Sequence, residues 1–84
     1  MDVTIDGIKY QPKPEQAAGA LPLRLVWKMR LYLRAEGAKL RAEGDKLWAE
    51  GILGVYGNIK LEWLYREGKN AEACKLENGE IYEP

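Results

Sequence analysis

The chain has 84 residues, about half the length of a usual domain, so we expect one small domain or one protomer of an assembly. Its 13 basic and 13 acidic residues cancel, and 46% of the residues are hydrophobic, which argues against a disordered chain and against a nucleic-acid-binding tail. One cysteine cannot form an intramolecular disulfide, and a chain without histidine or serine lacks the usual groups of acid–base and nucleophilic catalysis. We therefore predict a protein that is not an enzyme.

Residues 1–11 predict a short β-hairpin. Asp6 and Gly7 separate two short runs of β-branched and aromatic residues, and this pair is typical of a two-residue hairpin turn. Residues 12–20 follow as a connector, because their two prolines can neither continue a helix nor donate a hydrogen bond to a sheet.

Residues 21–53 show two conflicting periodicities. Over 23–33, apolar residues alternate with mostly charged ones, which taken alone favours a strand. The segment continues without a breaker into three seven-residue units of good helix formers, and seven is a helical period. These units are Leu33–Lys39, Leu40–Lys46 and Leu47–Leu53. We predict one long helix over 21–53 with a heptad repeat over 33–53, and a strand over 23–33 is the alternative.

The repeat places leucine and glycine on one stripe of the predicted helix. Each interior glycine costs about 0.5–1 kcal/mol relative to alanine, so three on one face indicate close approach by another helix. A helix over 21–53 would be about 50 Å long, against roughly 30 Å for a compact chain of this size, so we expect the second helix to come from another copy, as in a coiled coil. The predicted self-association residues are the leucines and glycines of the repeat: Leu33, Gly37, Leu40, Gly44, Leu47 and Gly51.

Residues 58–84 predict a small antiparallel β-meander. Apolar and charged residues alternate over 59–65, which indicates a strand, with a helix as the rival interpretation. Asn78 and Gly79 separate two further short runs and predict a second two-residue hairpin. The predicted fold class is therefore α+β: one long Gly/Leu-seamed amphipathic helix with short β-hairpins and an oligomeric helical core.

The charges are segregated along the chain. Residues 21–34 carry four cations and no anion, whereas 62–84 are predominantly acidic. An anion could dock on the basic segment with Trp27 or Tyr32 stacking beside it. The candidate anion-binding residues are the four cations: Arg24, Lys28, Arg30 and Arg34. Neutralisation by the acidic segment is the favoured alternative, and nucleic acid and a membrane surface are disfavoured partners.

Other sites for chemistry are not supported by the spacing of the residues. The three aspartates are scattered along the sequence, so we predict no metal site and no cofactor. Glu36, Glu43 and Glu50 recur about 10 Å apart on the predicted helix, too far to share a proton. Cys74 has no histidine to activate it, and we expect it to be a half-buried strand residue.

The sequence indicates a cytoplasmic location. Charged side chains interrupt the most hydrophobic stretch, which leaves no run of about 18 apolar residues for a membrane span. The first ten residues start acidic and lack the apolar region of a secretory signal. A lone cysteine also fits a reducing compartment.

Three motifs occur together in this chain. They are the tandem L-x-A-E-G-D-K heptads, a Tyr-Gly-Asn-Ile segment at 56–59 and a Cys-x-Leu-Glu-Asn-Gly-Glu hairpin at 74–80. In these motifs the chain resembles small uncharacterised proteins of tailed bacteriophages, over roughly residues 33–84. The resemblance implies an accessory protein made in the cytoplasm of an infected bacterial host, where short proteins often bind and disable host factors.

The expected function follows from these observations together. We expect a non-enzymatic, self-associating binding protein, a phage accessory factor that occupies or sequesters a host protein or a small anionic signal molecule. The alternative is a structural or adaptor protein of a phage particle. The expected partners are further copies of the chain and a host protein or nucleotide-like small molecule, with no membrane.

Overall fold

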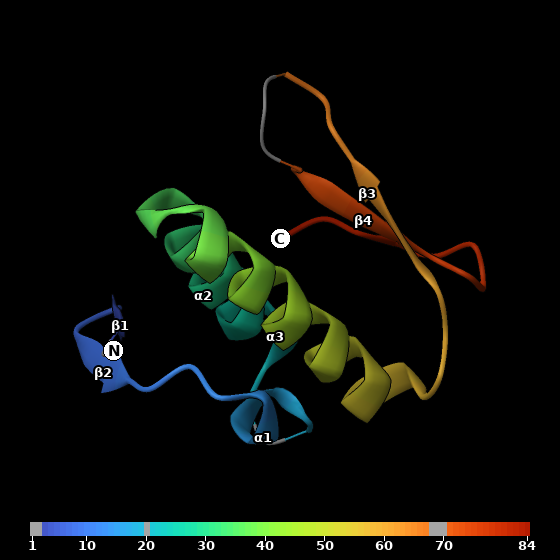
Figure 1. Cartoon of the computed structure of the whole chain (residues 1–84). Coiled ribbons are helices and arrows are strands. Elements are labelled where there is room, and N and C mark those ends of the chain that lie inside the picture. The colour runs from blue at the N-terminus through green and yellow to red at the C-terminus, as the bar shows by residue number, and fades with distance from the viewer. Residues whose placement is uncertain (1–2, 20, 68–70) are drawn as a thin grey trace.

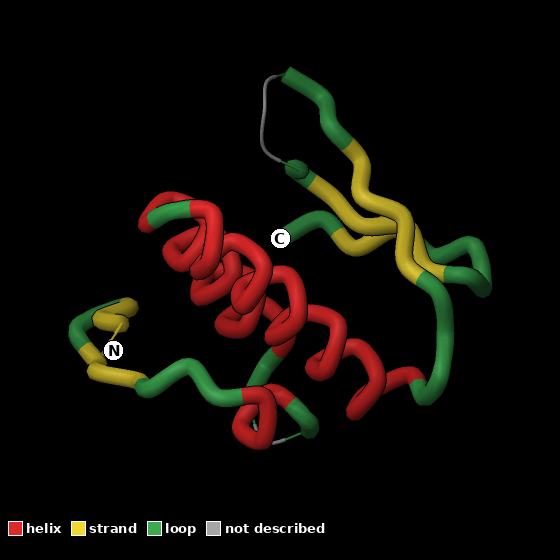
Figure 2. The backbone as a smooth tube through the Cα atoms, viewed as in Figure 1, coloured by secondary structure: helices red, strands yellow, loops and turns green. Residues whose placement is uncertain are grey.

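Helices and two small antiparallel sheets build the chain in a computed structural model that describes residues 3–19, 21–67 and 71–84 (Figure 1). The fold class is α+β, as the sequence predicts. The elements in chain order are β1 (Val3–Ile5), β2 (Ile8–Tyr10), α1 (Pro14–Ala17), α2 (Leu23–Glu36), α3 (Ala38–Tyr56), β3 (Leu61–Leu64), β4 (Ala73–Leu76) and β5 (Ile81–Tyr82). Helices α2 and α3 lie side by side, with the N-terminal hairpin on one side of them and the three-stranded sheet on the other (Figure 2).

The single long helix predicted over 21–53 is wrong. The chain ends α2 at Glu36, turns at Gly37 and begins α3 at Ala38, so that the two helices fold back on each other. Gly37 has φ 145° and ψ 169°, a conformation that is essentially restricted to glycine because it has no Cβ. The strand alternative over 23–33 is also excluded, since this segment lies within α2.

The remaining glycines of the repeat allow α3 to approach α2 closely. A Cβ added at Gly44 would lie 2.7 Å from the carbonyl oxygen of Arg30 and 3.1 Å from Cβ of Leu33. One added at Gly51 would lie 3.2 Å from Cγ1 of Val26. The close helix contact implied by the repeat therefore occurs within one chain. Because α2 and α3 are two shorter helices that cover each other, their length does not require a second copy of the chain.

The N-terminal hairpin has the predicted turn. Strands β1 and β2 pair antiparallel, with Val3 opposite Tyr10. Asp6 and Gly7 have φ values of 54° and 80°, and a type I′ turn requires positive φ at both positions. Val3 is fully buried and anchors the hairpin against the helices.

The predicted connector 12–20 contains one short helix, α1, which begins at Pro14. Proline is well suited to the first turn of a helix, because the amide hydrogen that it lacks would have no partner there. Helix α1 packs on the end of α3. A Cβ at Gly54 would lie 2.7 Å from the main chain of Ala18 and of Gly19, so this contact also depends on a glycine.

The C-terminal strands form the predicted meander in the order β3-β4-β5. Residues 61–64 are a strand, which excludes the helical interpretation of this segment. Trp63 pairs with Cys74, and Cys74 pairs with Tyr82. The turn at Asn78 and Gly79 is not the predicted two-residue type, because only Gly79 has a positive φ; the pairing of Lys75 with Ile81 indicates a longer loop.

The core lies between the helical pair and this sheet. Trp27 of α2 and Trp48 of α3 meet edge to face, with their ring centroids 4.8 Å apart and an interplanar angle of 87°. The ring of Tyr82 lies 4.8 Å from Trp48 and 5.7 Å from Trp27. Such geometries add about 0.5–1.5 kcal/mol per aromatic pair beyond the burial of the rings. Among the residues described, no helix has both the length and the apolar character needed to cross a membrane.

Substitution of Gly44 by alanine should test the helix contact. Alanine favours the helical conformation by about 1 kcal/mol relative to glycine. Its Cβ, however, would collide with the main-chain oxygen of Arg30. Gly44→Ala should therefore lower the free energy of unfolding by about 1–3 kcal/mol. Gly51→Ala is the matched control, because its closest neighbour is a side-chain methyl that can yield. Urea unfolding measures both variants. Equal stabilisation by both would show that the helices do not touch at Gly44.

Candidate functional site

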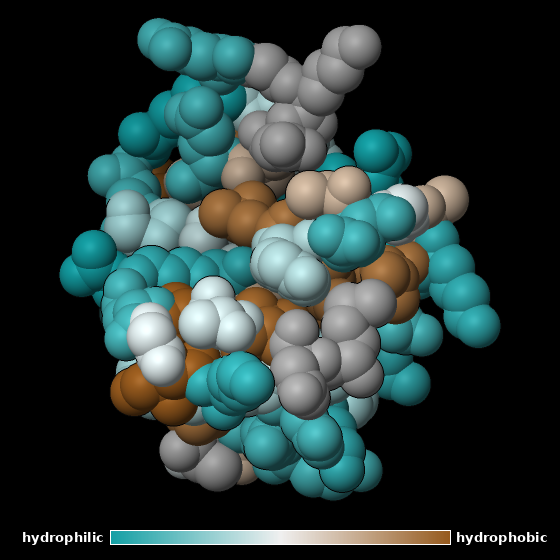
Figure 3. All heavy atoms as spheres, turned by 90° about the vertical axis from the view of Figure 1, so that its left-hand side faces the viewer, coloured by the Kyte–Doolittle hydropathy of each residue, from teal (hydrophilic) through white to brown (hydrophobic). Residues whose placement is uncertain are grey.

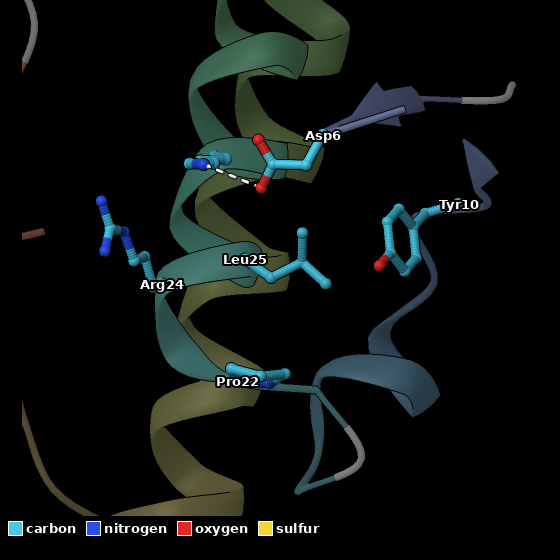
Figure 4. A pocket seen from close by; sticks show the side chains of 6 residues that line it. Asp6, Tyr10, Pro22, Arg24 and Leu25 are labelled. Atoms are coloured by element: carbon cyan, nitrogen blue, oxygen red, sulfur yellow. Dashed lines mark hydrogen bonds and ion pairs between the residues drawn. The ribbon is translucent and has the colours of Figure 1, made fainter. Parts of the chain in front are cut away.

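A pocket lies between α2 and the N-terminal hairpin (Figure 4). It is an open pocket of about 470 Å³, a volume comparable to that of small-molecule sites, about 300–1,000 Å³. The lining residues come from the hairpin and from the start of α2: Asp6, Tyr10, Pro22, Arg24, Leu25 and Lys28. On the face of the molecule that carries the hairpin, apolar and hydrophilic residues intermingle (Figure 3).

Two of the lining side chains form an apolar slot within the pocket. Leu25 projects from α2 toward the hairpin, and the ring of Tyr10 stands opposite to it, with the hydroxyl directed toward the helix (Figure 4). Pro22 closes one end of this slot, where α2 begins. A flat apolar or aromatic group fits such a slot, because its two faces would contact Tyr10 and Leu25.

The rim of the pocket is basic with one carboxylate. Lys28 pairs with Asp6 of the hairpin turn at 3.3 Å, and the two side chains are 39% and 77% exposed. Arg24 lies one helical turn before Lys28, so the two cations share one side of α2. Arg24 extends from the helix away from Tyr10 at the edge of the pocket, and among the residues described it makes no ion pair (Figure 4).

The structure divides the four predicted anion-binding residues into two pairs. Arg24 and Lys28 line the pocket, whereas Arg30 and Arg34 lie against α3. There Asp45 accepts a hydrogen bond from Nε of Arg30 at 3.0 Å, and its carboxylate lies 3.6 Å from Nη1 of Arg34. Asp45 therefore balances one of these two charges, so the ionic partner comes from α3 rather than from the acidic C-terminal segment.

Arg30 is part of the core. Its side chain is 0% exposed, and its guanidinium carbon lies 4.0 Å from the ring centroid of Trp63 and 4.8 Å from that of Trp27. Burial lowers the pKa of Arg30, and the charge of Asp45 opposes this shift. The guanidinium stays charged, as arginine does in proteins. Stacked between a helix and a strand, Arg30 joins the helical pair to the sheet and is not accessible to a ligand.

The predicted self-association residues are largely occupied by their own chain. Leu33, Gly44, Leu47 and Gly51 are buried, Leu40 is half-buried, and Gly37 forms the link between the helices. A second copy has no access to the buried positions. Self-association stays a prediction, but the leucine–glycine seam is used within the chain.

Side chains suited to other chemistry are not gathered in the part of the chain that the structure describes. Residues 3–19, 21–67 and 71–84 hold no group of three or more side chains that could ligate a metal ion. Cys74 is fully buried, and burial raises the pKa of its thiol. A buried, protonated thiol is a poor nucleophile, so Cys74 serves packing.

Sequence reasoning missed four lining residues of the pocket. The sequence predicts Asp6 only as a turn residue and assigns no binding role to Tyr10, Pro22 and Leu25, all of which line the pocket. Their only signal is tertiary proximity, since the hairpin lies against the side of α2 from which Leu25 projects.

Comparison with known proteins shows no family for this chain. No protein-family description, no curated protein and no solved structure matches it. The function is therefore argued from the geometry of the site.

Replacement of Arg30 should show how much the stacked guanidinium stabilises the fold. Lysine keeps the charge but loses the planar contact with both tryptophans, so Arg30→Lys should lower the free energy of unfolding by about 2 kcal/mol or more. Arg30→Met is the control: it keeps an apolar stem without a buried charge and should lose less. Urea unfolding compares them. Wild-type stability in Arg30→Lys would contradict the stacking role.

The buried thiol should make stability depend on alkaline pH. Because the pKa of Cys74 is raised in the fold, the unfolded chain loses this proton first as the pH rises past about 8.5. The free energy of unfolding should therefore fall as the pH rises above about 8.5, and fall less in Cys74→Ala. Iodoacetamide should modify Cys74 rapidly only in urea. Rapid modification of the native protein would contradict the burial.

Proposed function

We propose that this protein is a non-enzymatic binding protein that sequesters a small anionic molecule in the pocket between α2 and the N-terminal hairpin. One observation carries the proposal: the apolar side chains of Tyr10 and Leu25 and the cations Arg24 and Lys28 line one pocket. The slot suits a flat ring, and the two cations suit an anionic group attached to it. A nucleotide-like molecule combines both features.

The resemblance to phage proteins supports a setting for this activity. In an infected bacterium, a protein that binds a small anionic signal lowers the concentration of the free signal without changing it chemically. The effect is stoichiometric, so it needs at least as many copies of the protein as of the signal. It requires no catalytic group and does not depend on self-association.

Neutralising the two cations tests the proposal. The probe is 1-naphthyl phosphate, which carries a flat ring and an anion. Arg24→Gln with Lys28→Gln should weaken its binding about tenfold or more, because charge-assisted hydrogen bonds contribute about 1.5–3 kcal/mol each and solvent reduces this at an exposed site. Isothermal titration calorimetry measures the affinity, which should also fall with added salt.

The matched control removes two cations elsewhere. Lys39 and Lys46 are exposed on α3, and Lys39→Gln with Lys46→Gln makes the same change in net charge away from the pocket. This variant should bind 1-naphthyl phosphate like the wild type. Absence of binding to the wild type, or equal binding by the Arg24 and Lys28 variant, would overturn the proposal. Recovery of the protein in purified virions would favour the structural alternative.

A further inference from the structure

We infer that Asp6 is a built-in competitor for the anion at Lys28, so that a ligand anion binds there only by displacing this carboxylate, and that a phosphomonoester, with its larger charge, does so better than a carboxylate. This inference rests on the proposed function, because it concerns the ligand class of the same pocket. It starts from the ion pair between Asp6 and Lys28, which lie 22 positions apart in the sequence and 3.3 Å apart in the structure.

The hairpin turn places the Asp6 carboxylate at the pocket. Asp6 is the one non-glycine residue with a positive φ among the residues described, and this conformation belongs to the turn. Asparagine would satisfy such a turn equally well, but only aspartate brings a negative charge to Lys28. Figure 4 shows the carboxylate above the slot between Leu25 and Tyr10, joined to the amine of Lys28.

The carboxylate takes the position that a ligand anion would need. Lys28 faces the pocket and already has an anionic partner, which is tethered through the hairpin and so is present at a high effective concentration. Any ligand that binds Lys28 must displace this partner. The hairpin itself need not leave, because Val3 is fully buried and β1 contacts α2 independently of the ion pair.

Displacing Asp6 costs every anion the same, so the preference depends on what the incoming anion gains at Lys28. A carboxylate ligand replaces one carboxylate by another at Lys28, so it gains nothing at this position. A phosphomonoester carries about −1.5 to −2 charges near pH 7 and three acceptor oxygens, so it can contact Lys28 and Arg24 together. The displaced Asp6 repels it only weakly, because a side chain that is 77% exposed is well screened. The geometry therefore selects the phosphate.

Two probes that share one ring test the selectivity. Calorimetry compares 1-naphthyl phosphate with 1-naphthoate in the wild type and in Asp6→Asn, which keeps the turn and removes the charge. The wild type should prefer the phosphate. Asp6→Asn should bind both probes about two- to fivefold more tightly, by a similar factor for each, because the lost ion pair is weak and exposed and costs both probes the same.

A charge control completes the experiment. Glu36→Gln removes one negative charge at the far end of α2, where Glu36 is exposed, and should leave both affinities unchanged. If Asp6→Asn behaves like Glu36→Gln while the Arg24 and Lys28 variant loses binding, the competitor role is overturned and the proposed function stands. Equal wild-type affinity for the two probes overturns the selectivity. Undiminished binding by the Arg24 and Lys28 variant overturns the proposed function itself.

Discussion

The main-chain contact between α2 and α3 at Gly44 sets the distance between the helices on which the rest of the structure is arranged. Without a Cβ at this position, α3 can lie against the carbonyl oxygen of Arg30. The same closeness brings Trp48 onto Trp27 and Asp45 onto Arg30. The guanidinium of Arg30, held in this way, stacks between the helical pair and the sheet. The absence of a side chain at Gly44 therefore allows both the aromatic core and the stacking of Arg30 against the sheet to form.

The same helix pair explains why the four cations of the basic segment lie in two different environments. Successive residues of a helix point about 100° apart, so cations that are close in sequence point to different neighbours. Arg30 and Arg34 face α3 and share Asp45 as their ionic partner, whereas Lys28 pairs with Asp6 of the hairpin and Arg24 extends from α2 at the edge of the pocket. The first pair stabilises the fold. The second pair stays exposed to solvent beside an apolar slot, and this is the combination that suits a small organic anion.

The N-terminal hairpin completes the pocket with very few residues. Its buried Val3 anchors it, Tyr10 supplies one wall, and Asp6 brings a carboxylate to Lys28. None of these contacts is local, because the hairpin and α2 are separated by the connector and α1. The hairpin therefore forms one side of the pocket, and in the competitor scheme its turn also supplies the carboxylate that a ligand anion must displace.

The sequence by itself determined the α+β class, the Asp6-Gly7 turn and the strand at 61–64. Each of these depends on a local pattern of neighbouring residues that favours one backbone conformation. It also determined that the heptads are helical. Only the tertiary structure decided what their glycines do: Gly37 ends a helix, while Gly44 and Gly51, in the same Ala-Glu-Gly context, stay inside one. Glycine permits both conformations, so the choice depends on the energy gained when α3 packs on α2. The packing of α3 on α2 also determines which way each side of α2 faces. For this reason only two of the four predicted cations, Arg24 and Lys28, line the pocket.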